Sequence, residues 1–302
     1  MNAINPMMPT NWTVSKVTAN GLEQNYYRTG GNKPSLLLLH GFSENGLCWS
    51  RVARALEPDF EVIMPDARGH GLSGGPETGY NPELLIEDTV EFIKVLGVNK
   101  PILIGHSNGA LTAAGVAAAQ PELVTATVVI DPPWREEVRP MPVSSGGEPW
   151  PGFNAWYNSW LDWHIALRNQ TPEERLASSA RFLPPGSANW EKEEFFNHLE
   201  AQAQFNLDVM NFAPFVPTAT PWRSTVERIQ GPLLLIMGNP KLGAFVTTAE
   251  AAHIMEASYK GRLLNFEEAG HFMYRGLTAE KFDNFISVLK GHLQQFPANI
   301  RY

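Results

Sequence analysis

Short runs of apolar residues that end in turn residues recur along this chain and alternate with helical patterns. Strands buried on both faces read as continuous apolar runs, so the alternation predicts an α/β protein with a mostly parallel, eight-stranded sheet and helices on both faces. WTVSKVT and LEQNYYRTG form the expected opening antiparallel hairpin. The other predicted strands lie at 35–41, 60–66, 101–107, 125–133, 232–238 and 262–268, and the predicted helices between them at 47–56, 82–96, 110–119, 247–257 and 279–296.

The interval from residue 134 to 226 breaks this rhythm and contains no predicted strand. It is rich in proline and aromatic residues, and its pattern favours helices at 153–168, 172–180 and 192–211. We expect it to be a helical cap inserted after the sixth strand, with residues 1–133 and 227–302 forming the core domain.

Seven of the nine tryptophans of the chain fall in this interval. They either form its own core, since a small helical layer needs bulky residues, or cover a site as an apolar lid. The candidates for substrate contact are Trp134, Trp160 and Trp163.

Composition narrows the choice of partner and compartment. The 302 residues carry a formal charge of -8 with a pI near 5.5 and no block of like charges, which argues against nucleic acid or an anionic membrane as partner. Cys48 is the single cysteine, so no intramolecular disulfide can form. No stretch has the roughly 18 to 20 apolar residues of a membrane span. We expect a soluble, cytoplasmic protein with a small apolar ligand, and a homodimer stays open.

One serine stands in a pattern that is typical of a nucleophile. An apolar strand leads into Gly105-His106-Ser107-Asn108-Gly109, and an alanine-rich helix follows. Glycines two positions before and after the serine suit a very tight strand-to-helix turn, in which side chains would clash. The helix start directs free backbone N–H groups and a positive dipole end toward the same point. We predict that Ser107 is a nucleophile and not merely a turn residue.

A serine hydroxyl needs a base, so this hypothesis requires a histidine on a loop after a later strand. His271 follows the last predicted strand and so reaches the same edge of the sheet as Ser107. Of the other histidines, His40, His70 and His106 lie in turn sequences, and the remainder lie in helical patterns.

The third member of such a triad is a carboxylate that orients the imidazole. The loop after the predicted strand 232–238 has no acidic residue before Glu250, whereas Asp131 ends the preceding predicted strand. We predict Asp131 as this acid, against the alternative that it only caps the turn into Pro132. Two backbone N–H groups should stabilise an oxyanion, those of Asn108 and of Phe42, which follows Gly41.

Together these motifs resemble the α/β-hydrolase superfamily, in its capped branch. They are HGF (40–42), PDARGHGLS (65–73), GHSNG (105–109), DPPW (131–134) and EAGH (268–271). The resemblance implies that Ser107 is the nucleophile, His271 the general base, and Phe42 and Asn108 the oxyanion donors, with Arg68, Gly69 and His70 structural.

The acid departs from the pattern of the family. Most members carry it after strand seven, where this chain has Asn239-Pro240-Lys241, but some dehalogenases and lactonases place it after strand six, as Asp131 would be. Dehalogenases and epoxide hydrolases of this fold use aspartate at the position of Ser107, which argues against those activities.

The leading hypothesis is hydrolysis of a carboxylic ester or lactone of a bulky apolar or aromatic substrate, through an acyl-enzyme on Ser107. The alternatives are carbon-carbon bond hydrolysis of a ring-fission product, cofactor-free perhydrolysis, and a ligand-binding receptor with little turnover. No phosphate loop or metal-ligand cluster stands out in the sequence, so no cofactor and no metal are expected.

Overall fold

The computed structural model describes residues 8–134, 153–178, 187–211 and 222–296. Its centre is the eight-stranded sheet that the sequence predicts, and the strand order is β1-β2-β4-β3-β5-β6-β7-β8. The strands are β1 (Thr13–Ala19), β2 (Leu22–Arg28), β3 (Ser35–Leu39), β4 (Glu61–Pro65), β5 (Ile102–His106), β6 (Ala126–Ile130), β7 (Leu233–Gly238) and β8 (Gly261–Phe266). Strand β2 pairs antiparallel with both β1 and β4, and the pairs from β4 through β8 are parallel.

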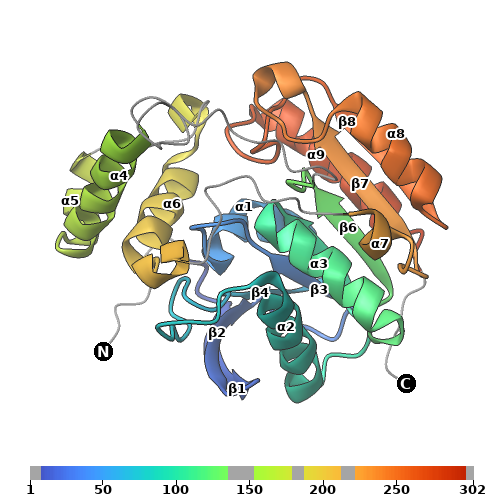
Figure 1. Cartoon of the computed structure of the whole chain (residues 1–302), viewed down its shortest axis with the longest axis horizontal. Helices are drawn as coiled ribbons and strands as arrows, with labels where there is room; N and C mark the ends of the chain where they lie inside the picture. The colour runs from blue at the N-terminus through green and yellow to red at the C-terminus, as the bar shows by residue number, and fades with distance from the viewer. Residues whose placement is uncertain (1–7, 135–152, 179–186, 212–221, 297–302) are drawn as a thin grey trace.

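Helices cover both faces of the sheet (Figure 1). Helices α1 and α9 pack on one face, and α2, α3, α7 and α8 pack on the other. Their bounds are α1 (Ser50–Leu56), α2 (Pro82–Leu96), α3 (Asn108–Ala119), α7 (Arg223–Val226), α8 (Thr248–Ala257) and α9 (Ala279–Leu293).

Strand β3 shows why the central strands read as continuous apolar runs. Successive side chains of a strand point to opposite faces. Leu36 and Leu38 accordingly enter the layer under α1 and α9, whereas Leu37 and Leu39 enter the layer under α2 and α3. Each of these four leucines is at most 6% exposed, and burying one contributes about 1.5 to 3 kcal/mol.

Between β6 and β7 the described residues form helical elements. They are α4 (Phe153–Arg168), α5 (Pro172–Ser178), α6 (Lys192–Gln204) and α7, with 3-10 turns at Ser187–Asn189 and Leu207–Asn211. We call α4, α5 and α6 the inserted helices; they lie to one side of the sheet, over the end where β3 and β4 lead into α1 and α2 (Figure 1). Among the described residues, no helix is long and apolar enough to cross a membrane.

The predicted continuous helix 192–211 is wrong, because it breaks after Gln204 and only a 3-10 turn at Leu207–Asn211 follows. Helix α6 ends at Gln204, and Phe205 is extended and fully buried. The backbone N–H of Asn206 donates to the carbonyl oxygen of Gly69 (2.8 Å), so the chain leaves the helix to dock on the core. Tertiary packing here overrides local helical preference. Smaller differences concern helix ends. The helix predicted at 110–119 begins two residues earlier, at Asn108, and the helix predicted at 279–296 ends earlier, at Leu293. Of the helix predicted at 172–180, residues 179–180 lie outside the described part.

Candidate active site

Ser107 occupies a strained turn between β5 and α3. Its backbone lies at φ 54° and ψ -119°, a conformation that residues with a Cβ rarely adopt. A Cβ added at Gly105 would lie 2.1 Å from the carbonyl oxygen of Gly109, and one added at Gly109 would lie 2.2 Å from that of Leu39. Both glycines are therefore required sterically, as expected for a nucleophile elbow.

Asp131 and His271 meet at the carboxyl edge of the sheet. The Nδ1 atom of His271 lies 2.6 Å from Oδ2 of Asp131, whose side chain is fully buried. Strand pairing brings Ser107 beside them, because its N–H donates to the carbonyl oxygen of Ile130, the residue before Asp131 (3.0 Å). Asp131 has a left-handed backbone, at φ 43°.

The loop after β7 supplies donors to Asp131 in place of an acid of its own. The N–H of Phe245 lies 3.0 and 2.9 Å from the two carboxylate oxygens, and the N–H of Val246 donates to Oδ1 (3.0 Å). The ring of Phe245 also meets the imidazole of His271 edge-to-face, at 4.4 Å between centroids. The Asp131 carboxylate is thus fixed by backbone donors of the loop after β7.

His271 is held as a neutral imidazole at pH 7. Burial lowers its pKa, and the neighbouring His106 lowers it further, while the Asp131 carboxylate opposes both. His106 also anchors the loop, since its Nε2 atom lies 3.0 Å from the carbonyl oxygen of His271. A neutral imidazole whose Nδ1 faces a carboxylate has its Nε2 available as a base.

The loop after β3 forms a tight turn from Gly41 to Glu44. The N–H of Glu44 donates to the carbonyl oxygen of Gly41 (3.2 Å), and the N–H of Gly41 donates to Oε2 of Glu44 (2.8 Å). Phe42 and Ser43 are the central residues, and Ser43 is left-handed at φ 56°. The turn lies against the elbow, because a Cβ at Gly41 would lie 3.2 Å from Nδ1 of His106. We call residues 41–44 the oxyanion turn, after the role that the sequence predicts for the Phe42 N–H.

A buried ion pair behind this turn was missed by the sequence reasoning. Arg275 and Glu44 are 4% and 2% exposed, and their charged groups approach to 2.7 Å. Burial alone would raise the pKa of Glu44, but Arg275 and His106 hold it well below its usual range. No local signal in the sequence could have paired the two residues, since Glu44 in a turn and Arg275 in a loop are residue types that usually lie at the protein surface.

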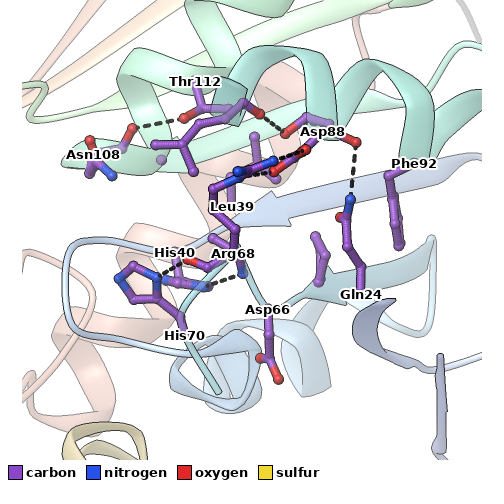
Figure 2. Close-up of a pocket in the computed structure, with 15 residues that line it drawn as sticks. Gln24, Leu39, His40, Asp66, Arg68, His70, Asp88, Phe92, Asn108 and Thr112 are labelled. Carbon is purple, nitrogen blue, oxygen red and sulfur yellow. Dashed lines mark hydrogen bonds and ion pairs between the residues drawn. The ribbon is translucent and has the colours of Figure 1, made fainter. Parts of the chain in front are cut away.

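Arg68 and His70 lie in a second buried cluster, shown in Figure 2. The guanidinium of Arg68 binds both carboxylate oxygens of Asp88, and Nδ1 of His70 lies 2.8 Å from the carbonyl oxygen of Arg68. They border a cavity of about 30 Å³ beneath the first turn of α3, which has room for one or two water molecules but not for a substrate. These residues fasten the turn after β4 to α2.

The three candidate tryptophans lie in different surroundings. Trp134 is buried in the layer under α2 and α3. Trp160 packs in a small cluster with Tyr80, Phe205, Val209 and Met210, against which Phe42 of the oxyanion turn also packs. Trp163 meets the ring of His164 edge-to-face. Trp160 is thus connected with the oxyanion turn through this aromatic cluster.

The fold and this site define a class of protein: an α/β protein with a serine on a strained strand-to-helix turn and a histidine-aspartate pair at the same sheet edge. Within the described ranges there is no group of three or more histidine, cysteine or acidic side chains that could hold a metal ion. The sequence model of the alpha/beta hydrolase family matches residues 36–279. The chain therefore belongs to the α/β-hydrolase family.

Similar proteins include two curated bacterial enzymes. N-formylmaleamate deformylase of Pseudomonas putida is 32% identical over 168 residues, covering 50% of this chain and 62% of the relative. 2-(Acetamidomethylene)succinate hydrolase of Mesorhizobium japonicum is 38% identical over 104 residues, covering 34% of this chain and 37% of the relative. The matched segments thus span less than two thirds of these relatives.

A solved structure of N-formylmaleamic acid deformylase from Pseudomonas putida S16 superposes with a TM-score of 0.72. It is 21% identical, and the match covers 90% of this chain and 99% of that one. At this identity, the likeness concerns the fold alone.

Proposed function

We propose that the protein is a serine hydrolase that cleaves a carboxylic ester or lactone of a bulky apolar or aromatic substrate. The observation that carries this proposal is the placement of Ser107 on its strained turn, one strand from the Asp131-His271 pair. Strain at a polar residue in such a turn is a cost to stability that a purely structural serine would not need.

The proposed reaction has two halves. Nε2 of His271 takes the proton of Ser107 while Oγ attacks the acyl carbon, and the same proton then passes to the leaving alcohol oxygen. The ester C–O bond breaks and an acyl-enzyme remains. In the second half, His271 takes a proton from water and the hydroxide attacks the acyl carbon. The bond to Oγ then breaks, His271 returns a proton to Ser107, and the carboxylic acid product leaves.

Backbone donors stabilise the charge that develops on the carbonyl oxygen. The N–H of Asn108 is free of the helical ladder because it belongs to the first turn of α3, where the helix dipole also favours negative charge. The N–H of Phe42, on the oxyanion turn, is the second donor in this proposal. A hole of this kind contributes about 10²- to 10³-fold to kcat for each donor.

The apolar substrate is proposed from the aromatic residues near the oxyanion turn. The Phe42 ring lies 5.2 Å from that of Phe205, and the Trp160 ring lies 5.9 Å from Phe205. Aromatic side chains supply a large contact area for an apolar acyl group. Trp160 is our candidate for direct substrate contact.

A second candidate function is hydrolysis of an amide by the same residues. It is favoured by the two curated relatives, whose names describe an N-formyl and an acetamido substrate. An amide follows the same path, except that His271 must protonate a leaving nitrogen instead of an alcohol oxygen.

The test is turnover of a matched panel by wild type and Ser107→Ala. The panel holds p-nitrophenyl esters of increasing acyl length, one aromatic macrocyclic lactone, and N-formyl and N-acetyl amides of an unsaturated acid. We expect ester or lactone turnover with a burst of p-nitrophenol, and its loss in Ser107→Ala. Amide turnover alone would select the second candidate.

Three further outcomes would overturn the proposal. Turnover that survives in Ser107→Ala would remove Ser107 as the nucleophile. A folded wild type that binds members of the panel without turning any over would favour the receptor. Cleavage of a ring-fission diketone, assayed beside the panel, with no turnover of any panel member would favour the carbon-carbon hydrolase.

A further inference from the structure

The oxyanion turn is strained at the residue that follows the proposed donor Phe42. Ser43 is left-handed, at φ 56°, and it is the second central residue of the turn that the Glu44 N–H to Gly41 carbonyl bond closes. Glycine or asparagine normally fills such a position, because a Cβ disfavours it. If Ser43 relaxed to the right-handed region, the Phe42–Ser43 peptide would have to rotate, and this peptide adjoins the one that carries the Phe42 N–H.

A side chain from α6 holds Ser43 in this conformation. Nε2 of Gln202 donates to the carbonyl oxygen of Ser43 at 2.7 Å and lies 3.1 Å from its hydroxyl oxygen. Gln202 is only 2% exposed, so these bonds do not compete with bulk water. They connect an inserted helix directly to the oxyanion turn, across 159 positions of sequence.

The amide of Gln202 is itself fixed. Since the Ser43 carbonyl can only accept a hydrogen bond, Gln202 must present its NH₂ group there, and its Oε1 then faces Nε2 of His164 on α4 at 2.8 Å. His164 is fully buried, and burial lowers its pKa to about 4, so it is a neutral imidazole with one N–H, which Nε2 carries in order to donate to this oxygen. The chain of hydrogen bonds thus runs from His164 through Gln202 to Ser43.

Helix α6 is bonded to the core at neighbouring positions too. Nδ2 of Asn197 donates to the carbonyl oxygen of Leu47 (3.0 Å) and lies 2.9 Å from Oγ of Ser50. Nδ2 of Asn45 donates to Oε1 of Gln204 (3.0 Å). Gln202 is therefore presented by a helix that is docked along residues 43–50.

We infer that Gln202 is a positioning residue that keeps the oxyanion turn in its strained, donor-presenting form. The inference rests on the proposed function and deepens it, since it makes α6 part of the apparatus that stabilises the oxyanion. Displacing the Phe42 N–H weakens binding of the transition state, in which negative charge has developed, more than binding of the substrate. Gln202 therefore acts on kcat more than on KM. Glu44 fixes the turn from the core side and Gln202 fixes it from the inserted side.

The first experiment compares Gln202→Met with the control Gln294→Met. Both replace a glutamine by an apolar residue of similar length, but Gln294 is exposed at the end of α9 and lies beside the first residues of β3 and β5, at the sheet edge opposite Ser107. For ester turnover, we expect Gln202→Met to lower kcat about 10- to 100-fold, which is less than the effect of losing one oxyanion donor completely, with KM changed by less than about threefold. Gln294→Met should keep wild-type kcat.

A second readout reports the oxyanion directly. Phenylboronic acid forms a tetrahedral adduct in which Ser107 Oγ bonds to boron, so its inhibition constant tracks transition-state stabilisation. That constant should rise in Gln202→Met by about the factor by which kcat falls. Thermal unfolding is measured in parallel, and Gln202→Glu, which keeps the side-chain shape but removes the donor, is prepared in case the methionine variant does not fold.

The decisive measurement is a rescue. Glycine adopts a positive φ without strain, so in Ser43→Gly the turn should keep its form without the hydrogen bonds from Gln202. The double variant Ser43→Gly/Gln202→Met should recover at least half of the lost kcat on a logarithmic scale. A purely structural role for Gln202 predicts no such recovery.

The outcomes separate this inference from the proposed function. Unchanged kcat in folded Gln202→Met, or no rescue by Ser43→Gly, would overturn the inference while Ser107→Ala remains inactive. Turnover that persists in Ser107→Ala would instead defeat the proposed function, and the inference with it.

Discussion

Asp131, at the end of β6, binds Nδ1 of His271 at 2.6 Å and accepts N–H groups from the loop after β7. In this arrangement the loop after β7 supplies backbone donors to the carboxylate that the sequence predicts as the acid. Three donors, two from backbone and one from the imidazole, satisfy a carboxylate that is fully buried. The geometry explains how an acid on the neighbouring strand can reach the same histidine.

Replacing Asp131 by asparagine should remove most of the hydrolytic activity. The amide can no longer hold Nδ1–H as a carboxylate does, so the imidazole is left in the wrong tautomer and its cation loses its stabilisation. We expect kcat to fall by about 10⁴-fold with little change in KM, measured on the preferred ester of the panel.

The matched control is Glu268→Gln. Glu268 lies three residues before His271 but is exposed, and its carboxylate pairs with Lys281. This variant should retain wild-type kcat. A loss in Glu268→Gln together with near-normal Asp131→Asn activity would assign the acid to Glu268.

The fold could be predicted because its signals are local. Each central strand is a short apolar run that ends in turn residues, and the glycines of the elbow clash with specific backbone atoms when a Cβ is added. The carboxyl ends of neighbouring parallel strands share one edge, which is why the sequence could bring Asp131 and His271 to the same place. Their catalytic roles stay predictions.

The supporting contacts could not be predicted, since they join residues that look ordinary in sequence. Glu44 and Arg275 are charges that usually remain at the surface, and only the tertiary fold buries them as a pair. The bond between Gln202 and Ser43 depends on where α6 docks, and the end of that helix at Gln204 was itself mispredicted. Long-range packing decides such features.

The pH dependence of kcat/KM should show an acidic limb governed by His271. Burial and the neighbouring His106 lower the pKa of this residue below its usual value of about 6.5. The base is active when neutral, so activity is lost as the pH falls through that lowered pKa, and it is level through pH 7. A stopped-assay profile from pH 4.5 to 8 measures the midpoint, and a midpoint above about 6.5 would contradict the buried environment of His271.

Folding stability should also fall on acidification. Burial lowers the pKa of His70 and His198 to about 3 and that of His164 to about 4. The unfolded chain therefore binds protons below about pH 6.5 that the folded chain does not, and each such histidine costs about 1.4 kcal/mol per pH unit until its folded pKa is reached. Urea unfolding at pH 7, 6 and 5 tests this, and His198→Phe should reduce the slope by one proton; an unchanged slope would show that His198 charges freely in the folded protein.

Gly105, the first glycine of the strand-to-helix turn, should tolerate no side chain. Gly105→Ala would place a Cβ 2.1 Å from the carbonyl oxygen of Gly109, which forces β5 and α3 apart. We expect a loss of about 1 to 3 kcal/mol in the free energy of unfolding, together with loss of activity. Gly291→Ala in α9 is the control: its Cβ would meet nothing within 4 Å, so helix propensity should make that variant more stable by about 0.5 to 1 kcal/mol.

Breaking the buried pair of Glu44 and Arg275 should be costly. Glu44→Gln leaves the Arg275 guanidinium without a counter-charge in the interior, so we expect a loss of about 3 to 5 kcal/mol in the free energy of unfolding by urea titration. The exposed pair of Lys16 and Glu23 provides the comparison, and Glu23→Gln should change stability very little. Because Glu44 also receives the Gly41 N–H, folded Glu44→Gln should turn over ester more slowly even at temperatures well below its unfolding transition. Equal stability of the two variants would mean that solvent reaches Arg275, and that the pair does not hold the oxyanion turn from the core side.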